Sequence, residues 1–195
     1  MEEVAERNIK DAADFAARFF GENNVRRILL GGAEDTLAVF RSHLPKAWQS
    51  LVVGTFPVSM TASHSEVQER AMQIGIEAER RREARLVNSA VTAAAKGRGG
   101  VVKLEETLSA VHEGRVLTLL ISDGFRAPGR RCKRCGYMTT KRSQVCPFCG
   151  GNYEKIADAV ELAVRKVMQS GGEVEVLHDA SALSEHGNIG ALLRY

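Results

Sequence analysis

The sequence has no long apolar stretch. No run of apolar residues approaches the roughly 18 to 20 that a membrane-spanning helix needs. The first ten residues, MEEVAERNIK, have neither the basic flank nor the apolar segment of a secretory signal. We therefore expect no membrane partner and a cytoplasmic location. With 195 residues, 44% of them apolar, the chain can bury a sizeable core as one large domain or two small ones.

A recognisable catalytic constellation is also missing. No serine or cysteine stands in a nucleophile-elbow context, and the five histidines are scattered without metal-ligand spacing. The glycine-rich stretch 96–100 lacks the phosphate-loop pattern, so we interpret it as a flexible connector. Asp35, Asp123 and Asp179 each lie near a predicted strand end and could form the site of a metal-dependent nuclease. Turn and cap roles explain them more simply, and we expect neither catalysis nor a small-molecule substrate.

An excess of charge of one sign is absent overall but present locally. The chain has 27 basic and 24 acidic residues, which gives a net charge of +3. Residues 126–142 hold seven basic residues and no acid, so this stretch is +7 and the remainder is −4. We call these seven residues the basic island: Arg126, Arg130, Arg131, Lys133, Arg134, Lys141 and Arg142. They are either phosphate contacts for RNA or solvated charges that offset a negatively charged metal site.

Cysteine is scarce, and its four copies are clustered. Cys132, Cys135, Cys146 and Cys149 form C-x2-C-x10-C-x2-C, with a glycine directly after each pair. Two such turns can aim four thiolates at one point, which suits a closed, structural zinc site. A redox pair, an iron–sulfur site and four free thiols are the alternatives. The gap of ten residues predicts a small hairpin with its tip around 139–143.

Helical and strand patterns alternate along the chain. Helices are predicted over 9–20, 35–41, 66–95, 104–113 and 154–169, with Ser63 or Ser65 as the cap of the third. Strands are predicted over 25–30, 51–56, 116–122, 174–178 and 191–194. This alternation indicates an α/β fold. The charged middle of the long helix predicts a boundary between two parts near residue 83.

Four segments taken in order resemble a known family. They are VRRILLGGA at 25–33, LEETLSAVHEGRVLTLLISD at 104–123, the four-cysteine module, and GNIGALLRY at 187–195. Together they resemble the bacterial members of the archaeal–eukaryotic class-1 peptide chain release factor family, which includes the Pelota-type rescue factors.

The resemblance implies a domain organisation. Residues 1–83 look like the latter part of the family's middle domain, which is RNase-H-like. Residues 84–195 look like the C-terminal α/β domain, which is similar to kink-turn-binding proteins and carries an inserted zinc module, here at 126–153. By this comparison the chain starts partway through a domain, so we expect it to be a piece of a longer protein; a member that has lost hydrolysis is the alternative.

The resemblance also implies a function, with one departure. The family hydrolyses peptidyl-tRNA through a Gly-Gly-Gln loop, whereas this chain has only Gly31-Gly32-Ala33 and Gly99-Gly100-Val101. We therefore expect an adaptor portion in translation termination or ribosome rescue. Its implied partners are the ribosome, ribosomal RNA or tRNA, and a translational GTPase. The alternatives are an RNA-binding module outside termination and an RNase-H-like nuclease.

Overall fold

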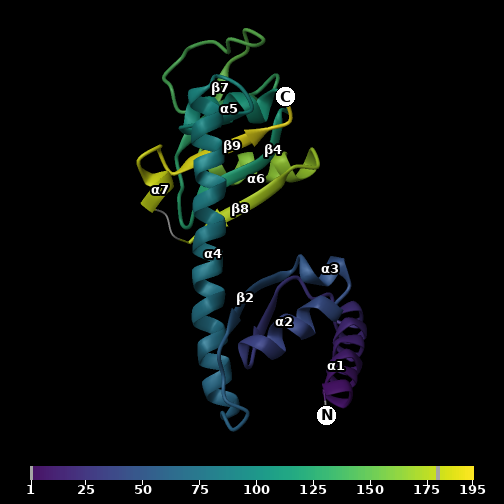
Figure 1. The fold of residues 1–195 in the computed structure, drawn as a ribbon. Coiled ribbons are helices and arrows are strands. Elements are labelled where there is room, and N and C mark those ends of the chain that lie inside the picture. The colour runs from purple at the N-terminus through teal and green to yellow at the C-terminus, as the bar shows by residue number, and fades with distance from the viewer. Residues whose placement is uncertain (1, 179–180) are drawn as a thin grey trace. The chain divides into compact units, whose positions relative to one another are not determined.

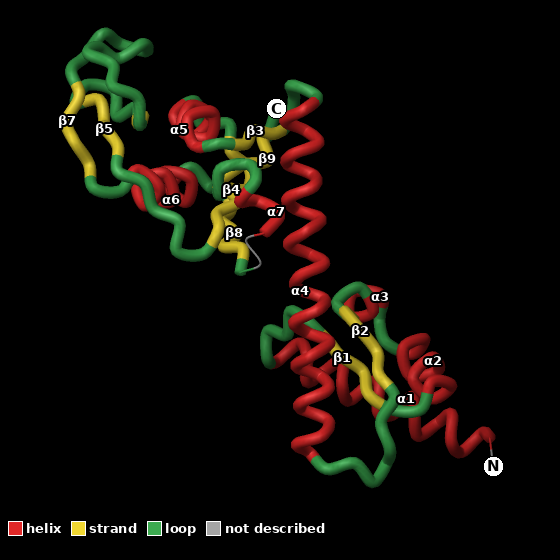
Figure 2. The backbone as a smooth tube through the Cα atoms, turned by 90° about the vertical axis from the view of Figure 1, so that its left-hand side faces the viewer, coloured by secondary structure: helices red, strands yellow, loops and turns green. Residues whose placement is uncertain are grey.

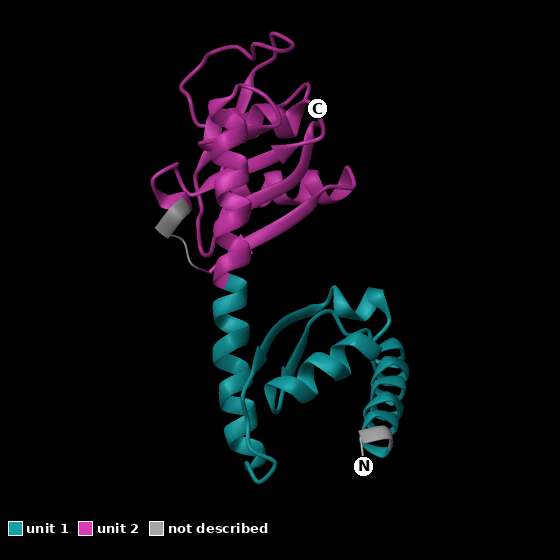
Figure 3. Ribbon diagram, viewed as in Figure 1, with its two compact units in different colours: residues 1–79 teal, residues 80–195 magenta. Residues whose placement is uncertain are grey.

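The computed structural model describes residues 2–178 and 181–195, which form two compact units, Met1–Glu79 and Arg80–Tyr195 (Figure 3). Each unit combines helices with a small sheet, so the α/β prediction is confirmed. None of the helices in these described ranges is both long and apolar enough to span a membrane. Asp179 lies outside the described residues.

The first unit is built on a two-stranded parallel sheet. Strands β1 and β2 pair in parallel, with Leu30 opposite Thr55 and Gly31 opposite Phe56. The elements are α1 (Glu2–Glu22), β1 (Ile28–Gly31), α2 (Glu34–His43), α3 (Lys46–Gln49), β2 (Val52–Phe56) and the first part of α4 (His64–Ala95). Its buried apolar residues are Ala13, Ile28, Leu30, Leu44 and Phe56.

Helix α4 begins with a reciprocal cap. The Ser63 backbone N–H donates to Glu66 Oε2 over 2.9 Å, and the Glu66 backbone N–H donates to Ser63 Oγ over 3.3 Å. This is a capping box, which satisfies amides that have no partner inside the helix. The predicted cap at Ser63 is confirmed, and the helix continues through Gly75 without interruption.

The second unit is built on a four-stranded sheet in the order β3-β9-β4-β8. Strands β9, β4 and β8 are labelled in Figure 1, and all four are labelled in Figure 2. Strand β9 is antiparallel to both neighbours, and β4 and β8 are parallel. The strands are β3 (Gly100–Val102), β4 (Val116–Ser122), β8 (Glu173–Leu177) and β9 (Ile189–Leu193), and the helices are α5 (Leu104–His112), α6 (Ala159–Gln169) and α7 (Ser181–Ser184).

Successive residues of β4 enter opposite faces of this sheet, as expected for a strand buried on both sides. Leu119 and Ile121 join the core cluster under α5 and α6, whereas Leu120 joins the cluster with Val87 of α4. In this unit α5 and α6 therefore cover one face, and the C-terminal part of α4 covers the other (Figure 2).

The cysteine module forms a sheet of its own, with β5 (Gly129–Cys132), β6 (Met138–Thr139) and β7 (Tyr153–Ile156) in the order β6-β5-β7. The predicted hairpin tip at 139–143 is wrong. The hairpin joins β5 to β6, so its turn is the first cysteine knuckle at 133–137. Residues 140–152 contain no strand. The turn falls at the knuckle because the pair Cys132–Cys135 itself reverses the chain.

The predicted start of the helix at 154 is also wrong. Strand β7 pairs with β5, and α6 begins only at Ala159. Asp158 fixes this start, since its Oδ1 accepts hydrogen bonds from the Val160 backbone N–H at 2.9 Å and the Glu161 backbone N–H at 3.3 Å. A side-chain cap of this kind takes extended backbone geometry and ends the preceding strand.

Candidate metal centre

The two C-x2-C segments form matching turns. The Gly136 N–H donates to the Cys132 carbonyl over 2.9 Å, and the Gly150 N–H donates to the Cys146 carbonyl over 2.8 Å. Both glycines have positive φ, 75° and 67°, a backbone conformation that side chains disfavour. The glycine after each cysteine pair therefore closes a tight turn, as the sequence pattern indicated.

The turns bring the four sulfurs together. All four Sγ atoms lie within 4.8 Å of one another, with Cys132 and Cys149 separated by 3.4 Å and Cys135 and Cys146 by 3.6 Å. The four cysteines are free thiols rather than disulfides. This cluster could hold a metal ion, and it is the only such group of three or more ligands in the described ranges.

Backbone amides favour the thiolate form at two of these sulfurs. The N–H groups of Cys135 and Arg134 donate to Cys132 and lower its pKa to about 6, although burial opposes the shift. At Cys146 burial raises the pKa, but N–H donors from Phe148 and Cys149 outweigh it and the net direction is down. Burial raises the pKa of Cys135 to about 12. Metals bind thiolates, so amide donors aimed at sulfur suit a metal centre.

Close packing against the sulfurs requires a glycine at position 151. A Cβ added there would lie 3.0 Å from Cys132 Sγ, 3.3 Å from Cys149 Sγ and 2.9 Å from Arg134 Cβ. Real Cβ atoms essentially never approach another atom to less than 3.0 Å. The loop after the second turn can therefore pass beside the sulfurs only as glycine backbone.

Two side chains of α5 contact the module, and a lysine of α6 lies beside one of them. Glu105 accepts hydrogen bonds from Thr139 Oγ1 at 2.7 Å, from the Thr140 N–H at 2.6 Å and from Thr140 Oγ1. His112 packs against Tyr137 and Phe148, and Lys166 Nζ lies 3.2 Å from His112 Nδ1. Sequence reasoning missed these residues, since none belongs to a local motif.

The basic island divides into two groups. Arg131 pairs with Glu154 at 2.6 Å, Arg130 donates to the Ser143 carbonyl at 3.2 Å, and Arg134 donates to the Cys149 carbonyl at 3.2 Å. Four residues are exposed, and their side chains have no hydrogen bond or ion pair with any described residue; these are Arg126, Lys133, Lys141 and Arg142. Of these, Lys141 acts on the Glu105 carboxylate through its charge.

The aspartates proposed for a nuclease do not converge. Asp35 lies in the first turn of α2, and Asp123 follows β4, where its carboxylate is 3.7 Å from His178 Nδ1. Neither belongs to a group of three or more potential ligands among the residues that the structure describes. The described residues therefore lend no support to a nuclease site.

The fold is similar to that of Dom34 and Pelota. The chain matches yeast (S. cerevisiae) Dom34, described as a translation termination-like factor, over 100% of its own length and 54% of Dom34, with 14% identity and a TM-score of 0.63. It matches ribosome-bound archaeal Pelota over 97% of its own length and 49% of Pelota, with 22% identity and a TM-score of 0.57. The chain thus spans about half the length of these relatives.

The sequence points to the same group. Residues 1–75 match the model of the family described as "Bacterial archaeo-eukaryotic release factor family 10", so the resemblance found in the sequence is confirmed. No curated protein matches the chain.

Proposed function

We propose that this chain is the ribosome-binding portion of a release-factor-like protein that acts in translation termination or ribosome rescue. The match of residues 1–75 to the bacterial release factor family carries this proposal, and the shared fold with Dom34 and Pelota supports it. Archaeal Pelota is described as ribosome-bound together with ABCE1, and Dom34 as interacting with Hbs1. By analogy we propose ribosomal RNA and a translational GTPase as partners, and the cytoplasm as the location.

The proposed domain assignment follows the same analogy. Residues 1–83 would correspond to the latter part of the middle domain, and residues 84–195 to the C-terminal domain with the module at 126–153. Without a Gly-Gly-Gln loop in residues 1–195, this portion acts by binding. Peptide release would require a glutamine that positions water, which these residues do not present.

The metal in the module is proposed to be zinc, held by Cys132, Cys135, Cys146 and Cys149. A closed shell of four sulfurs leaves no open coordination position, so the role is structural. Elemental analysis of protein prepared without chelator should give one zinc per chain. Protein without metal, with all four thiols freely titratable, would contradict the assignment.

Part of the basic island is proposed to contact RNA phosphate. Arg130, Arg131 and Arg134 already bond within the module, so Arg126, Lys133 and Arg142 are the better contacts. Cations without a base-reading platform give affinity with little sequence selectivity. Each phosphate contact releases counterions, so binding should weaken steeply with salt.

The test is cosedimentation with ribosomes across a range of salt. Changing Arg126, Lys133 and Arg142 to Glu should weaken binding and lower the salt slope by about 0.7 for each phosphate that is no longer neutralised. A matched variant replaces three exposed basic residues of α1, Arg7, Lys10 and Arg18, by Glu. Equal weakening in both variants would overturn the RNA contacts. Binding to free structured RNA but not to ribosomes would favour the module outside termination.

A further inference from the structure

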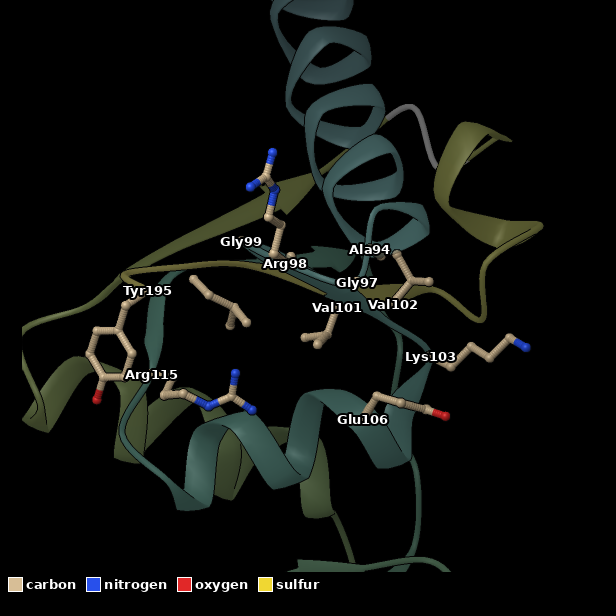
Figure 4. Close-up of a pocket in the computed structure, with 12 residues that line it drawn as sticks. Ala94, Gly97, Arg98, Gly99, Val101, Val102, Lys103, Glu106, Arg115 and Tyr195 are labelled. Atoms are coloured by element: carbon tan, nitrogen blue, oxygen red, sulfur yellow. The ribbon is translucent and has the colours of Figure 1, made fainter.

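A groove at the edge of the second unit's sheet has no role in the proposed function. It has a volume of about 510 Å³, within the range typical of ligand sites. It lies between β3, the end of β9 and helix α5 (Figure 4). No residue of the basic island lines it.

Apolar side chains form the floor of the groove. Val101 of β3 points toward α5. Leu193 of β9 also lines the groove. Both are partly exposed at the rim of the core cluster. Tyr195, with 77% of its surface exposed, stands at one end. A ligand that fills the groove therefore gains by burying apolar groups of its own.

The rim of the groove is positively charged. Arg98 and Lys103 are exposed, and neither side chain has a hydrogen bond or ion pair within residues 2–178 and 181–195. Arg115 reaches between the sheet and α5, where its charge is shared with Glu113. Glu106 is the acidic residue among the lining side chains. A ligand therefore needs negative charge where it meets the rim, but it does not need negative charge along the whole groove.

The backbone along the groove ends in an open edge. Strand β3 is the last strand of the sheet and pairs with β9 alone among the described strands. The bonds from Leu193 N–H to Gly99 O and from Lys103 N–H to Ile189 O fix the antiparallel register. In that register the backbone N–H and C=O of Val102 point away from β9. An extended peptide can pair with such an edge.

A phosphate ligand fits this groove less well. The glycine-rich turn before β3 ends helix α4, and its amides are already used, since Gly97 N–H donates to Ala94 O and Arg98 N–H to Ala93 O. A phosphate cradle needs such amides free. The apolar floor and the carboxylate of Glu106 also disfavour a continuous polyanion.

We propose that this groove binds an extended segment of a partner protein in which acidic and apolar side chains alternate. Its backbone adds to the edge of β3, its apolar side chains cover Val101 and Leu193, and its carboxylates pair with Arg98 and Lys103. Strand addition supplies affinity through main-chain hydrogen bonds, and the rim charges select the acidic sequence.

The test titrates the isotope-labelled chain with two peptides by nuclear magnetic resonance. The first is acetyl-Glu-Val-Asp-Leu-Asp-Val-amide, and the second has lysine in place of each acid. The acidic peptide should shift the amides of Val101, Val102 and Leu193 in a saturable manner. The double variant Arg98→Glu/Lys103→Glu should bind it about tenfold more weakly, as expected when two surface ion pairs are removed.

A matched variant separates local from general charge effects. Arg85 of α4 and Lys155 of β7 are also exposed and do not line the groove, so Arg85→Glu/Lys155→Glu should bind like the parent. Three outcomes would overturn the proposal. The first is the absence of a saturable shift up to about 5 mM of the acidic peptide, which corresponds to a binding free energy weaker than about −3 kcal/mol. The others are equal binding of the lysine peptide and tighter binding of oligouridine at the same amides.

Discussion

The sheet of the second unit and the cysteine module attached to it are stabilised in different ways. The sheet buries large apolar side chains on both faces, and Leu108, Leu119, Leu120, Leu177 and Ile189 are fully inaccessible. The buried cluster of the module consists of Cys132, Tyr137 and Cys146. Burial of apolar area alone can sustain the sheet, whereas a module of about 28 residues lies below the size at which a core suffices.

The sheet and the module are also packed against each other, at a junction formed by β5, β6 and α6. Met138 of β6 belongs to the core cluster of the sheet, and Gly129 of β5 lies so close to Ala159 that an added Cβ would be 2.9 Å from its methyl group. The cysteine cluster of the module is therefore separate from the core of the sheet, whereas strands β5 and β6 pack against that core. Substitutions on either side should show how far one region depends on the other.

Loss of the metal site should have the largest effect. Structural zinc contributes an apparent 10 to 16 kcal/mol in small zinc-finger peptides. In Cys132→Ser, we expect residues 129–156 to lose protection from hydrogen exchange, while β4 and β9 keep theirs. The measurement is exchange by mass spectrometry, with chelator-treated parent protein as a second route to the same state. Uniform loss of protection through the whole unit would mean that the sheet depends on the metal.

Truncation in the sheet should give the next largest effect and the opposite pattern. Leu119 is fully buried in β4, so Leu119→Ala should lower the free energy of unfolding by about 2 to 5 kcal/mol. Because the proposed metal ligands all belong to the module, we expect the metal content per folded chain to equal that of the parent protein. Urea unfolding and elemental analysis on the same samples check both points. Loss of metal from the folded variant would show that the sheet shapes the site.

Local sequence patterns predict much of the fold correctly. Strand β4 was predicted with its observed bounds because 116–122 is an apolar run long enough only for a buried strand. The start of α6 was mispredicted because Ile156 keeps helical spacing with Val160 although it belongs to β7. The signal that identifies the true start is Asp158 followed by Glu161 three residues later, a recognised cap pattern.

The candidate metal centre also combines features that the local sequence predicts with features that it does not. The spacing of the four cysteines was enough to predict their cluster, because each C-x2-C turn is a local structure. The contacts of Glu105 and His112 with the module join residues about 25 to 36 positions apart, and no local pattern encodes them. Arg130, Arg131 and Arg134 looked like RNA contacts in the sequence because charge is visible there, whereas their internal partners are not.

The junction can be weakened from Glu105, with a smaller effect. Its carboxylate holds Thr139 and Thr140, so Glu105→Gln should cost about 1 to 3 kcal/mol of local stability, seen as faster exchange at the Thr140 amide. Glu106→Gln, which changes the next residue of α5, is the control. Retained protection at Thr140 in Glu105→Gln would show that packing of Met138 alone holds the junction.

The same carboxylate gives the junction a pH dependence. Burial raises the pKa of Glu105, but the hydrogen bonds from Thr140 and Thr139 and the charge of Lys141 outweigh it, so the pKa is lowered from its ordinary value of 4.5. The contribution to stability is therefore complete above pH 4.5 and is lost as the pH falls below that value toward the lowered pKa. The protection factor at the Thr140 amide, which corrects for the intrinsic pH dependence of exchange, should fall in that range in the parent and not in Glu105→Gln.

The smallest expected effect concerns Asp158, which lies where the module rejoins the sheet. Its Oδ1 accepts from the amides of Val160 and Glu161 and, at 3.4 Å, from that of Ala127 on the incoming side of the module. Asp158→Ala removes a helix cap, which costs about 0.5 to 2 kcal/mol. Asp158→Asn keeps an accepting oxygen and should recover most of that loss.

Urea unfolding of both variants measures the stability that the cap contributes, and hydrogen exchange at the amides of Ala127 and Val160 shows which segments it stabilises. If the cap belongs only to α6, Val160 alone will exchange faster. If both amides do, Asp158 also ties the entry of the module to its exit, and the two regions are coupled without the metal.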